Sequence, residues 1–343
     1  MKVLSDLCTC ESSHIAQKDI VTSEGAYPIF GASGWLKNIG SYAQPHEYIA
    51  VVKDGAGVGR VSLCPACSSV LGTMQYVIPR EPTNIHFLFH LLRAAKLASY
   101  RTGSTIPHIY FSDYKSLVVP DVSIEEQEKI ARRLDSICDC VALRERQIAL
   151  FPQLAKSRFV EMFGDPVANP YKYEIAKLSE VSTDISAGGD KPTDTESIPS
   201  EIYPYPVFAN GLENDGLQCY ARSYTINQSA LTVSARGTIG YTFIRAPFFT
   251  PIVRLITVIP NQRVSLIYLK HAIDAMNLIV SGTSQAQLTV PNFKRLEILV
   301  PPLSLQTIFA AFIERLDKSE FTIRQSLAQL NTLYRSLLQE YFG

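Results

Sequence analysis

The chain has 343 residues, of which 46% are hydrophobic and 19% charged, so it is long and apolar enough to bury more than one core. This composition excludes intrinsic disorder for most of the chain. Lysine plus arginine and aspartate plus glutamate both total 32, which gives a net charge of zero. Any nucleic-acid partner must therefore be met by a local basic patch rather than by the overall charge.

The sequence also restricts where the protein works. No apolar run approaches the roughly 18–20 residues of a membrane span, and the start, MKVLSDLC, has an acidic residue where a signal peptide would be apolar. Seven cysteines, an odd number, favour free thiols in a reducing compartment over a disulfide framework. We therefore expect a cytoplasmic protein that does not contact a membrane.

The chain repeats itself once, at a shift of about 179 residues, and each half ends in Phe-Gly. We therefore expect an α/β (α+β) fold with a pseudo-two-fold internal repeat, in which two similar globular domains are separated by two long antiparallel helical segments. The matching stretches are YPIFGASG (27–34) with YPVFANGL (205–212), VVKDGAGVG (51–59) with TVSARGTIG (232–240), and TGSTIPHIYFSDYKSL (102–117) with SGTSQAQLTVPNFKRL (281–296).

Within each globular half, short runs of β-branched and aromatic residues alternate with Gly, Pro and Asn. YIAVV (48–52) and MQYVI (74–78) predict strands, and one amphipathic helix is expected near 83–99 and its equivalent near 264–280. The predicted boundaries are 1–120 for the first globular domain, 121–165 for the first helical segment, 166–300 for the second globular domain and 301–343 for the second helical segment.

The helical segments carry the clearest periodicity. Apolar residues recur at an average spacing of about 3.5, which is typical of a seam between two helices, and the natural partner for each seam is the other. Pro152 predicts a kink or restart near Phe151, so the first segment would be two shorter helices. The tracks, interrupted by Arg144, Arg158 and Glu320, comprise Ile130, Leu134, Ile137, Val141, Ile148, Phe151, Ala155 and Met162 in the first segment and Leu316, Ile323, Leu327, Leu330, Tyr334, Leu337 and Tyr341 in the second.

Two motifs suggest cofactors and also have simpler explanations. GAGVG (55–59) resembles a nucleotide-binding loop, but the strand-like RVSL that follows favours a glycine turn, so no cofactor is expected. Cys64 and Cys67 have zinc-knuckle spacing, and Cys8 and Cys10 offer two more thiolates. The second half has no cysteines at the corresponding positions, so ordinary cysteines at a hairpin tip are favoured and zinc stays open as the alternative.

No catalytic constellation emerges. His86 and His90 form the one pair with His-x-x-x-His spacing, and core packing of a buried helix explains both. A Gly-x-Ser-x-Gly elbow, a Walker loop and the Asn/Asp-Pro-Pro-aromatic segment of an amino-methyltransferase are all missing from the sequence. We therefore expect a non-catalytic chain with no bound metal, whose chemistry, if any, belongs to another subunit.

Positive charge gathers in the globular halves. Residues 217–300 contain eight lysines and arginines against two acidic residues, and residues 38–120 contain seven against four. The loops TGST (102–105) and SGTSQAQ (281–287) add small hydroxyl and amide side chains, which suit hydrogen bonds to phosphates and base edges. Two alternatives stay open: the loops are plain helix C-caps and turns, and the charges are a solvated pattern without function. The candidate DNA-binding residues are Lys53, Arg60, Arg101, Ser104, Thr105 and His108 in the first half and Arg222, Arg236, Arg245, Thr283, Ser284, Gln285 and Gln287 in the second.

The amino-acid sequences of the helical segments, and of the residues that lead into them, resemble those of the DNA-specificity subunits of type I restriction-modification systems. The resemblance is sharpest in IEEQEKIARRLDSI (124–137) and RFVEMFGDPVANP (158–170). The second half, LSLQTIFAAFIERLD (303–317), keeps Gln306 but lacks the acidic pair before it. The resemblance covers nearly the whole chain.

This resemblance implies two target-recognition domains, each reading one half of a bipartite, asymmetric site in double-stranded DNA. The paired helices, a coiled coil, would fix the gap between the half-sites and dock two adenine-N6 methyltransferase (modification) subunits, and restriction (motor and nuclease) subunits would join them. Two alternatives stay open: a two-domain interaction scaffold without DNA, and a self-contained restriction or modification enzyme. Salt-sensitive DNA binding separates the first alternative from the main interpretation.

Overall fold

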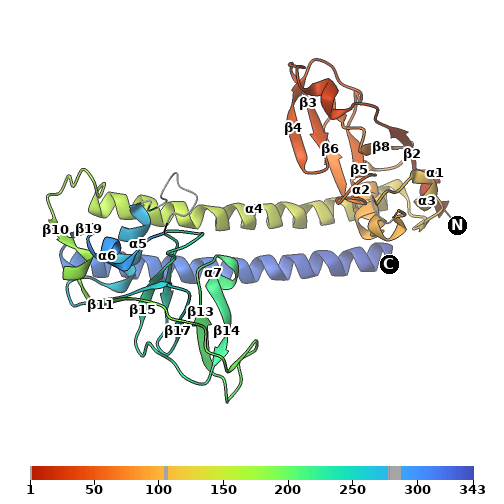
Figure 1. Cartoon of the computed structure of the whole chain (residues 1–343). Helices are drawn as coiled ribbons and strands as arrows, with labels where there is room; N and C mark the ends of the chain where they lie inside the picture. Colours follow the sequence, from red (N-terminus) through yellow and green to blue (C-terminus); the bar gives the residue numbers. More distant parts are fainter. Residues whose placement is uncertain (1, 104–106, 277, 279–286) are drawn as a thin grey trace. The chain divides into compact units, whose positions relative to one another are not determined.

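The computed structural model describes residues 2–103, 107–276, 278 and 287–343. Two compact units share the chain (Figure 1): unit 1 comprises Met1–Arg146 and Arg324–Gly343, and unit 2 comprises Gln147–Ile323. Each unit holds one globular domain together with part of each long helix, α4 (Ile124–Phe163) and α7 (Leu303–Phe342). Within the described ranges, no helix is long and apolar enough to cross a membrane.

Unit 1 contains a four-stranded antiparallel sheet, β2-β8-β5-β6, and a smaller sheet in which the β3–β4 hairpin takes β7 in parallel. The predicted strand 48–52 is β5, which is buried at every residue. The elements are β1 (Lys2–Val3, paired with β9), α1 (Leu4–Leu7), β2 (Cys8–Ser12), η1 (Gln17–Ile20), β3 (Tyr27–Gly31), β4 (Gly34–Ile39), β5 (Tyr48–Val52), β6 (Val61–Cys64), β7 (Ser69–Val70), β8 (Met74–Pro79), α2 (Ile85–Ala94), η2 (Leu97–Tyr100), α3 (Phe111–Tyr114) and β9 (Val118–Val119).

Unit 2 repeats this plan, because its four-stranded sheet, β11-β18-β15-β16, has the same strand order and β17 joins β13 in parallel as β7 joins β3. It adds one strand, β12, beside β14. The predicted internal repeat and fold class are thus confirmed. The elements are β10 (Glu174–Lys177, paired with β19), η3 (Leu178–Glu180), β11 (Ser182–Ala187), β12 (Thr195–Glu196), β13 (Tyr205–Phe208), η4 (Glu213–Gly216), β14 (Leu217–Ala221), β15 (Ala230–Val233), β16 (Thr242–Arg245), β17 (Thr250–Pro251), β18 (Ile256–Pro260), α5 (Leu266–Ala275), α6 (Val290–Lys294) and β19 (Glu297–Val300).

The two domain helices begin at equivalent caps. The Asn84 side chain accepts a hydrogen bond from the backbone N–H of Phe87 at the start of α2, and Ser265 accepts one from Tyr268 at the start of α5. Both helices are shorter than the ranges that periodicity predicts. The first ends before Lys96, whose φ of 47° is left-handed and therefore incompatible with a continuing helix.

The prediction that Pro152 divides the first helical segment is wrong. α4 is a single helix of 40 residues that contains the proline. Pro152 cannot donate a hydrogen bond to the carbonyl of Ile148, but its side chain lies on an exposed face. Water can therefore hydrate that carbonyl, and the turns after the proline are held by the buried residues Ala155, Phe159 and Phe163.

The predicted helix seam is confirmed in unit 1. Ile130, Leu134 and Ile137 of α4 share one buried cluster with Tyr334 and Leu337 of α7. Leu134 is fully buried, and both sheet and α2 residues belong to the same cluster. The early part of α4 thus packs on the late part of α7, as an antiparallel pair requires.

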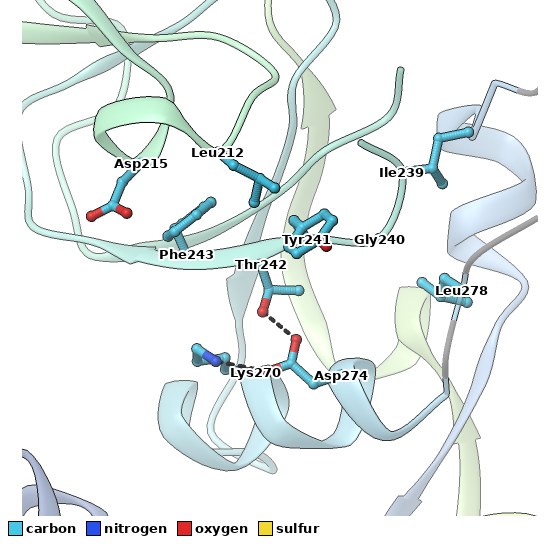
Figure 2. A pocket seen from close by; sticks show the side chains of 10 residues that line it. All are labelled: Leu212, Asp215, Ile239, Gly240, Tyr241, Thr242, Phe243, Lys270, Asp274 and Leu278. Carbon is cyan, nitrogen blue, oxygen red and sulfur yellow. Dashed lines mark hydrogen bonds and ion pairs between the residues drawn. The ribbon is translucent and has the colours of Figure 1, made fainter. Parts of the chain in front are cut away.

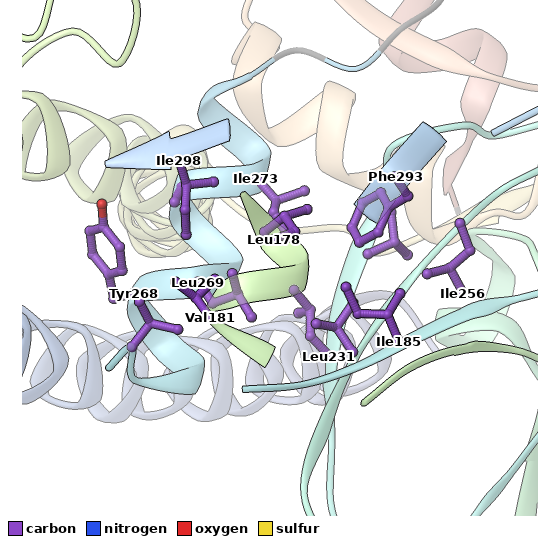
Figure 3. Packing of buried hydrophobic residues seen from close by; sticks show 14 of the residues in the cluster. Leu178, Val181, Ile185, Leu231, Ile256, Tyr268, Leu269, Ile273, Phe293 and Ile298 are labelled. Carbon is purple, nitrogen blue, oxygen red and sulfur yellow. The ribbon is translucent and has the colours of Figure 1, made fainter. Parts of the chain in front are cut away.

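In unit 2 the core is larger and more aromatic than the 3.5-residue track predicts. Phe159 and Phe163 of α4 pack with Phe309 and Ile313 of α7, and only Ala155 and the half-buried Met162 come from the predicted track. The same cluster continues under α5 into the sheet, as Figure 3 shows for Leu269, Ile273 and their neighbours. The globular domain and the helix pair are therefore built on one continuous core.

Candidate nucleic-acid interface

In both units a glycine-containing loop follows one of the central strands of the four-stranded sheet and is closed by a backbone hydrogen bond. In glycine loop 1 (residues 53–60) the Gly59 N–H donates to the carbonyl of Val52 at 2.9 Å. In glycine loop 2 (residues 234–240) the Gly240 N–H donates to the carbonyl of Ser234, also at 2.9 Å. Both loops lead into strands, β6 and β16. The interpretation of GAGVG as a turn is therefore confirmed, because a phosphate-binding loop would open a helix.

Gly59 shows why the turn needs glycine. Its φ is 81°, and a β-carbon added there would lie 2.3 Å from the backbone nitrogen of Ala98. Only a residue without a side chain allows glycine loop 1 to approach η2 this closely.

A second segment, residues 107–110 in unit 1 and residues 287–288 in unit 2, lies against each glycine loop. In unit 1 the Ile109 N–H donates to the Lys53 carbonyl at 2.8 Å. In unit 2 the Leu288 N–H donates to the Ala235 carbonyl at 3.0 Å. The structure thus brings together, in both units, a glycine loop and a second segment that are about 50 residues apart in the sequence. Their joint surface is the candidate interface.

In unit 1 this surface carries basic and aromatic side chains. Arg60 and Arg101 are exposed, and Lys53 and His108 are half-buried. The Thr102 hydroxyl and the His108 Nε2 lie 3.1 Å apart, and the His108 ring lies 5.3 Å from the ring of Tyr110. Tyr110 is 53% exposed and was not among the residues predicted from the sequence. Its place two residues after His108 is the feature of the sequence that could have identified it.

In unit 2 the corresponding surface pairs a cation with an amide. The exposed Arg236 donates from Nη2 to the Oε1 of Gln287 at 3.2 Å, so two predicted residues meet. Asn210 braces glycine loop 2: its Oδ1 accepts a hydrogen bond from the Ala235 N–H, and its Nδ2 donates one to the Val253 carbonyl, both at 2.7 Å. In unit 1 this brace comes from Arg60, whose Nη1 donates to the carbonyl of Ala32 at 2.6 Å.

The charges of this surface stay available to a ligand. Within the described part of the chain, no acidic side chain forms an ion pair with Lys53, Arg60, Arg101 or Arg236. Phosphate groups can therefore be bound without first breaking an internal pair. Five predicted residues, Ser104, Thr105, Thr283, Ser284 and Gln285, lie outside the described residues.

Two predicted arginines lie elsewhere. Arg245 is only 6% exposed, and its guanidinium lies 3.8 Å from the ring centre of Phe208 and 4.7 Å from that of Phe243. Its Nε donates to the Thr232 hydroxyl, and burial lowers the pKa of Arg245 to about 10. Arg245 as an exposed DNA contact is thus a mistaken placement, because a count of charges does not distinguish buried from exposed residues.

Arg222 is exposed but lies at the other end of the β13–β14 hairpin. It follows Ala221, which pairs with Tyr205 at the start of β13, whereas the Asn210 brace follows the end of β13. Its Nε forms an ion pair with Asp194 at 2.7 Å, and its Nη2 donates to the hydroxyl of Tyr203. The structure does not bring Arg222 together with Arg236.

A cavity of about 500 Å³ opens beside glycine loop 2, between α5 and β16 (Figure 2). Its polar groups bond to one another: Lys270 forms an ion pair with Asp274 at 2.7 Å, and the Thr242 hydroxyl donates to the same carboxylate. The cavity has the size of a small-ligand site, but two of its charged groups, Lys270 and Asp274, are already paired with each other. Its walls are Leu212, Asp215, Ile239, Gly240, Tyr241, Thr242, Phe243, Lys270, Asp274 and Leu278.

The cysteines that suggested zinc do not converge. All seven are free thiols, and among the described residues no group of three or more His, Cys, Asp or Glu side chains is placed to hold a metal. Cys8 and Cys10 lie two residues apart on β2, and burial raises the pKa of both thiols to about 12. Cys10 instead donates to the Oε1 of Gln75 at 3.3 Å.

A family model and curated proteins match the sequence over most of its length. The model described as the type I restriction modification DNA specificity domain matches residues 1–150 and 170–332. One protein of Mycoplasma pneumoniae, named as a type I specificity subunit, is 26% identical over 329 residues, covering 91% of this chain and 88% of that protein. A second, from the same organism and with the same kind of name, is 29% identical over 252 residues, covering 68% and 73%.

Solved structures share the fold. The S subunit of a type I restriction-modification system from M. genitalium aligns with a TM-score of 0.66 at 17% identity, covering all of this chain and 95% of that one. A structure that concerns complex assembly and conformational transition of the type I R-M system aligns with a TM-score of 0.61, also at 17% identity, covering 99% and 96%.

Proposed function

Because this chain belongs to the family of type I restriction-modification DNA specificity domains, we propose that each of its two units reads one half of a bipartite, asymmetric DNA sequence. The observation that carries the proposal is the repeated surface of glycine loop and second segment. Among the residues that the structure describes, the cations of both copies have no acidic partner, and the two copies present different side chains. Two different surfaces read two different half-sites, so the target is not a palindrome.

The proposed interface divides its contacts between two tasks. Lys53, Arg101 and Arg236 neutralise phosphates, which gives affinity and sets the register on the duplex. Gln287 and His108, with the predicted Ser, Thr and Gln residues of the same loops, hydrogen-bond to base edges and so give sequence preference. Arg60 and Asn210 hold the glycine loops in place, and neither Arg222 nor Arg245 belongs to the interface.

The chain works within a larger complex. We assign the chemistry to partners: two adenine-N6 methyltransferase subunits, joined by restriction subunits, in the cytoplasm. The long helices support this assignment, because apolar side chains lie exposed on them. Leu143, Leu150 and Leu154 of α4 are 57%, 52% and 51% exposed, and Phe321 of α7 is 63% exposed. Such an exposed apolar surface is typical of a site that another protein covers.

Selection from a random-sequence DNA pool, followed by binding at increasing salt, tests the proposal. The full chain is expected to enrich two unequal half-sites and to lose affinity steeply as salt rises. Arg236→Ala should lower the slope of log affinity against log salt by about 1. Arg222→Ala, which removes another exposed arginine of unit 2, is the matched control and should leave the slope unchanged. Salt-independent binding, or enrichment of no sequence, would contradict the proposal.

A further inference from the structure

Each long helix carries a buried glutamine in its first turn. Gln127 is the fourth residue of α4 and Gln306 is the fourth residue of α7, a shift of 179 residues. Gln127 is 5% exposed and Gln306 is fully buried. A primary amide has two donors and one acceptor with two lone pairs, and its burial is costly unless these are satisfied.

In unit 1 the Gln127 amide joins the long helix to the start of the domain helix. Its Oε1 accepts from the backbone N–H of Asn84 at 3.0 Å, and its Nε2 donates to the carbonyl of Val122 at 3.3 Å. Asn84 is the residue that caps α2. The first turn of α4 is therefore tied to the first turn of α2 by one side chain.

In unit 2 the Gln306 amide makes the equivalent connection with one more bond. Its Oε1 accepts from the backbone N–H of Ser265, the cap of α5, at 2.7 Å. Its Nε2 donates to the carbonyls of Arg263 and Pro301 at 3.0 Å and 2.8 Å. The same joint thus occurs twice, although the surrounding sequences differ.

These bonds constrain direction as well as distance. The hydrophobic core between a domain and its helices is non-directional and tolerates small rotations. A buried amide with two or three bonds to backbone groups requires one geometry, because each lost bond leaves an unsatisfied polar group in the interior. The joint therefore sets the angle between α2 and α4 within unit 1 and between α5 and α7 within unit 2.

We infer that Gln127 and Gln306 are positioning residues that fix how each recognition domain is held on its long helix, and thereby the length of the gap between the two half-sites. This inference rests on the proposed function. The two glutamines are buried and do not contact DNA. Their loss leaves the sequence of each half-site unchanged and relaxes the spacing.

The test compares gap lengths in sites selected by the full chain from a random-sequence pool. Gln127→Met and Gln306→Met retain most of the side-chain volume and remove every bond of the amide. Each is expected to enrich the half-sites of the unchanged protein, with gaps spread by about one base pair on either side, a change of about 3.4 Å in separation. Gln75→Met is the matched control, because Gln75 is a buried glutamine, 3% exposed, that donates to Tyr114 inside the domain of unit 1.

The outcomes separate the inference from the proposed function. If the unchanged protein enriches no bipartite site, the proposed function fails and the inference fails with it. If it does, and both variants retain a single gap length while only their melting temperature falls, the glutamines are merely structural and the inference is wrong. Gln127→Met loses two bonds rather than three, so it decides the question if Gln306→Met does not fold.

Discussion

The two units hold their equivalent domain helices, α2 and α5, against the long helices by different contacts: hydrogen bonds in unit 1 and aromatic packing in unit 2. In unit 1, His90 of α2 is fully buried, with Nδ1 2.9 Å from the Tyr334 hydroxyl and Nε2 2.8 Å from the Asp135 carboxylate. In unit 2, His271 of α5 occupies the equivalent position, and its ring lies 6.4 Å from that of Phe159 and 5.1 Å from that of Phe309.

The difference shows that, at this position, the repeat preserves the backbone and not the side-chain chemistry. Asp135 can only accept, so the Nε2 of His90 donates to it, and the Tyr334 hydroxyl donates to Nδ1 of a neutral ring. The position equivalent to Tyr334 in unit 2 is Ala155. Because Ala155 has no hydroxyl, the rings of Phe159 and Phe309 contact His271 instead. The glutamine joints stay alike, so the two units are expected to share geometry and to differ in how they respond to mutation and pH.

The largest expected effect is the loss of an aromatic ring from unit 2. Phe309 is fully buried, and its ring lies 5.6 Å from Phe159 and 5.4 Å from Phe163. Phe309→Ala should lower the free energy of unfolding by about 3–5 kcal/mol, measured by urea denaturation. Phe321→Ala on the same helix is the control and should change it by less than about 0.5 kcal/mol, because Phe321 is exposed. Equal losses would contradict the aromatic core.

Acid is expected to destabilise unit 2 through His271. Burial, with a smaller contribution from Lys270, lowers the pKa of His271 from 6.5 to about 4, and Asp274 opposes the shift. The unfolded chain therefore binds a proton more readily between these values. The stabilising contribution is complete above pH 6.5 and is lost as the pH falls toward 4, by up to about 3 kcal/mol.

His271→Phe tests this sign directly, because phenylalanine retains the aromatic packing and cannot be protonated. Its unfolding free energy should vary less between pH 6.5 and 4 than that of the unchanged protein. Burial also lowers the pKa of His90, although Asp135 opposes the shift, so unit 1 contributes in the same direction. Identical pH profiles for the two proteins would show that His271 is not protected from protonation.

A smaller effect is expected from the hydroxyl that distinguishes unit 1. Tyr334→Phe retains the ring and leaves Nδ1 of His90 without its donor, which should cost about 1–3 kcal/mol. Tyr341→Phe is the control on the same helix, because the Tyr341 hydroxyl accepts from Arg133 in an exposed position. If both substitutions cost the same in urea denaturation, the polar network does not stabilise unit 1.

Elements with a strong local pattern were predictable from the sequence. The strands at 48–52 and 74–78 and the two long helices carry β-branched or 3.5-residue periodicity that the structure confirms. The continuous helix through Pro152 was not predictable, because packing of the buried residues after the proline outweighs a local propensity. Phe159 and Phe163 lie off the predicted track, since the helix there packs against α5 as well as α7.

The candidate interface was predictable only in part. The internal repeat indicated which segments matter, and the structure shows that the glycine loop and the second segment meet in both units. The burial of Arg245 between two phenylalanine rings and the brace from Asn210 depend on contacts between distant segments. A charge count contains no information on such contacts, and the joint role of the two glutamines depends on them as well.

We propose that this chain directs modification to one bipartite DNA sequence. The decisive measurement is long-read mapping of N6-methyladenine in the source DNA, with and without this gene. We expect one motif, made of two unequal half-sites at a fixed spacing, to lose its methylation when the gene is removed. If methylation stays unchanged at every motif, the chain does not direct modification.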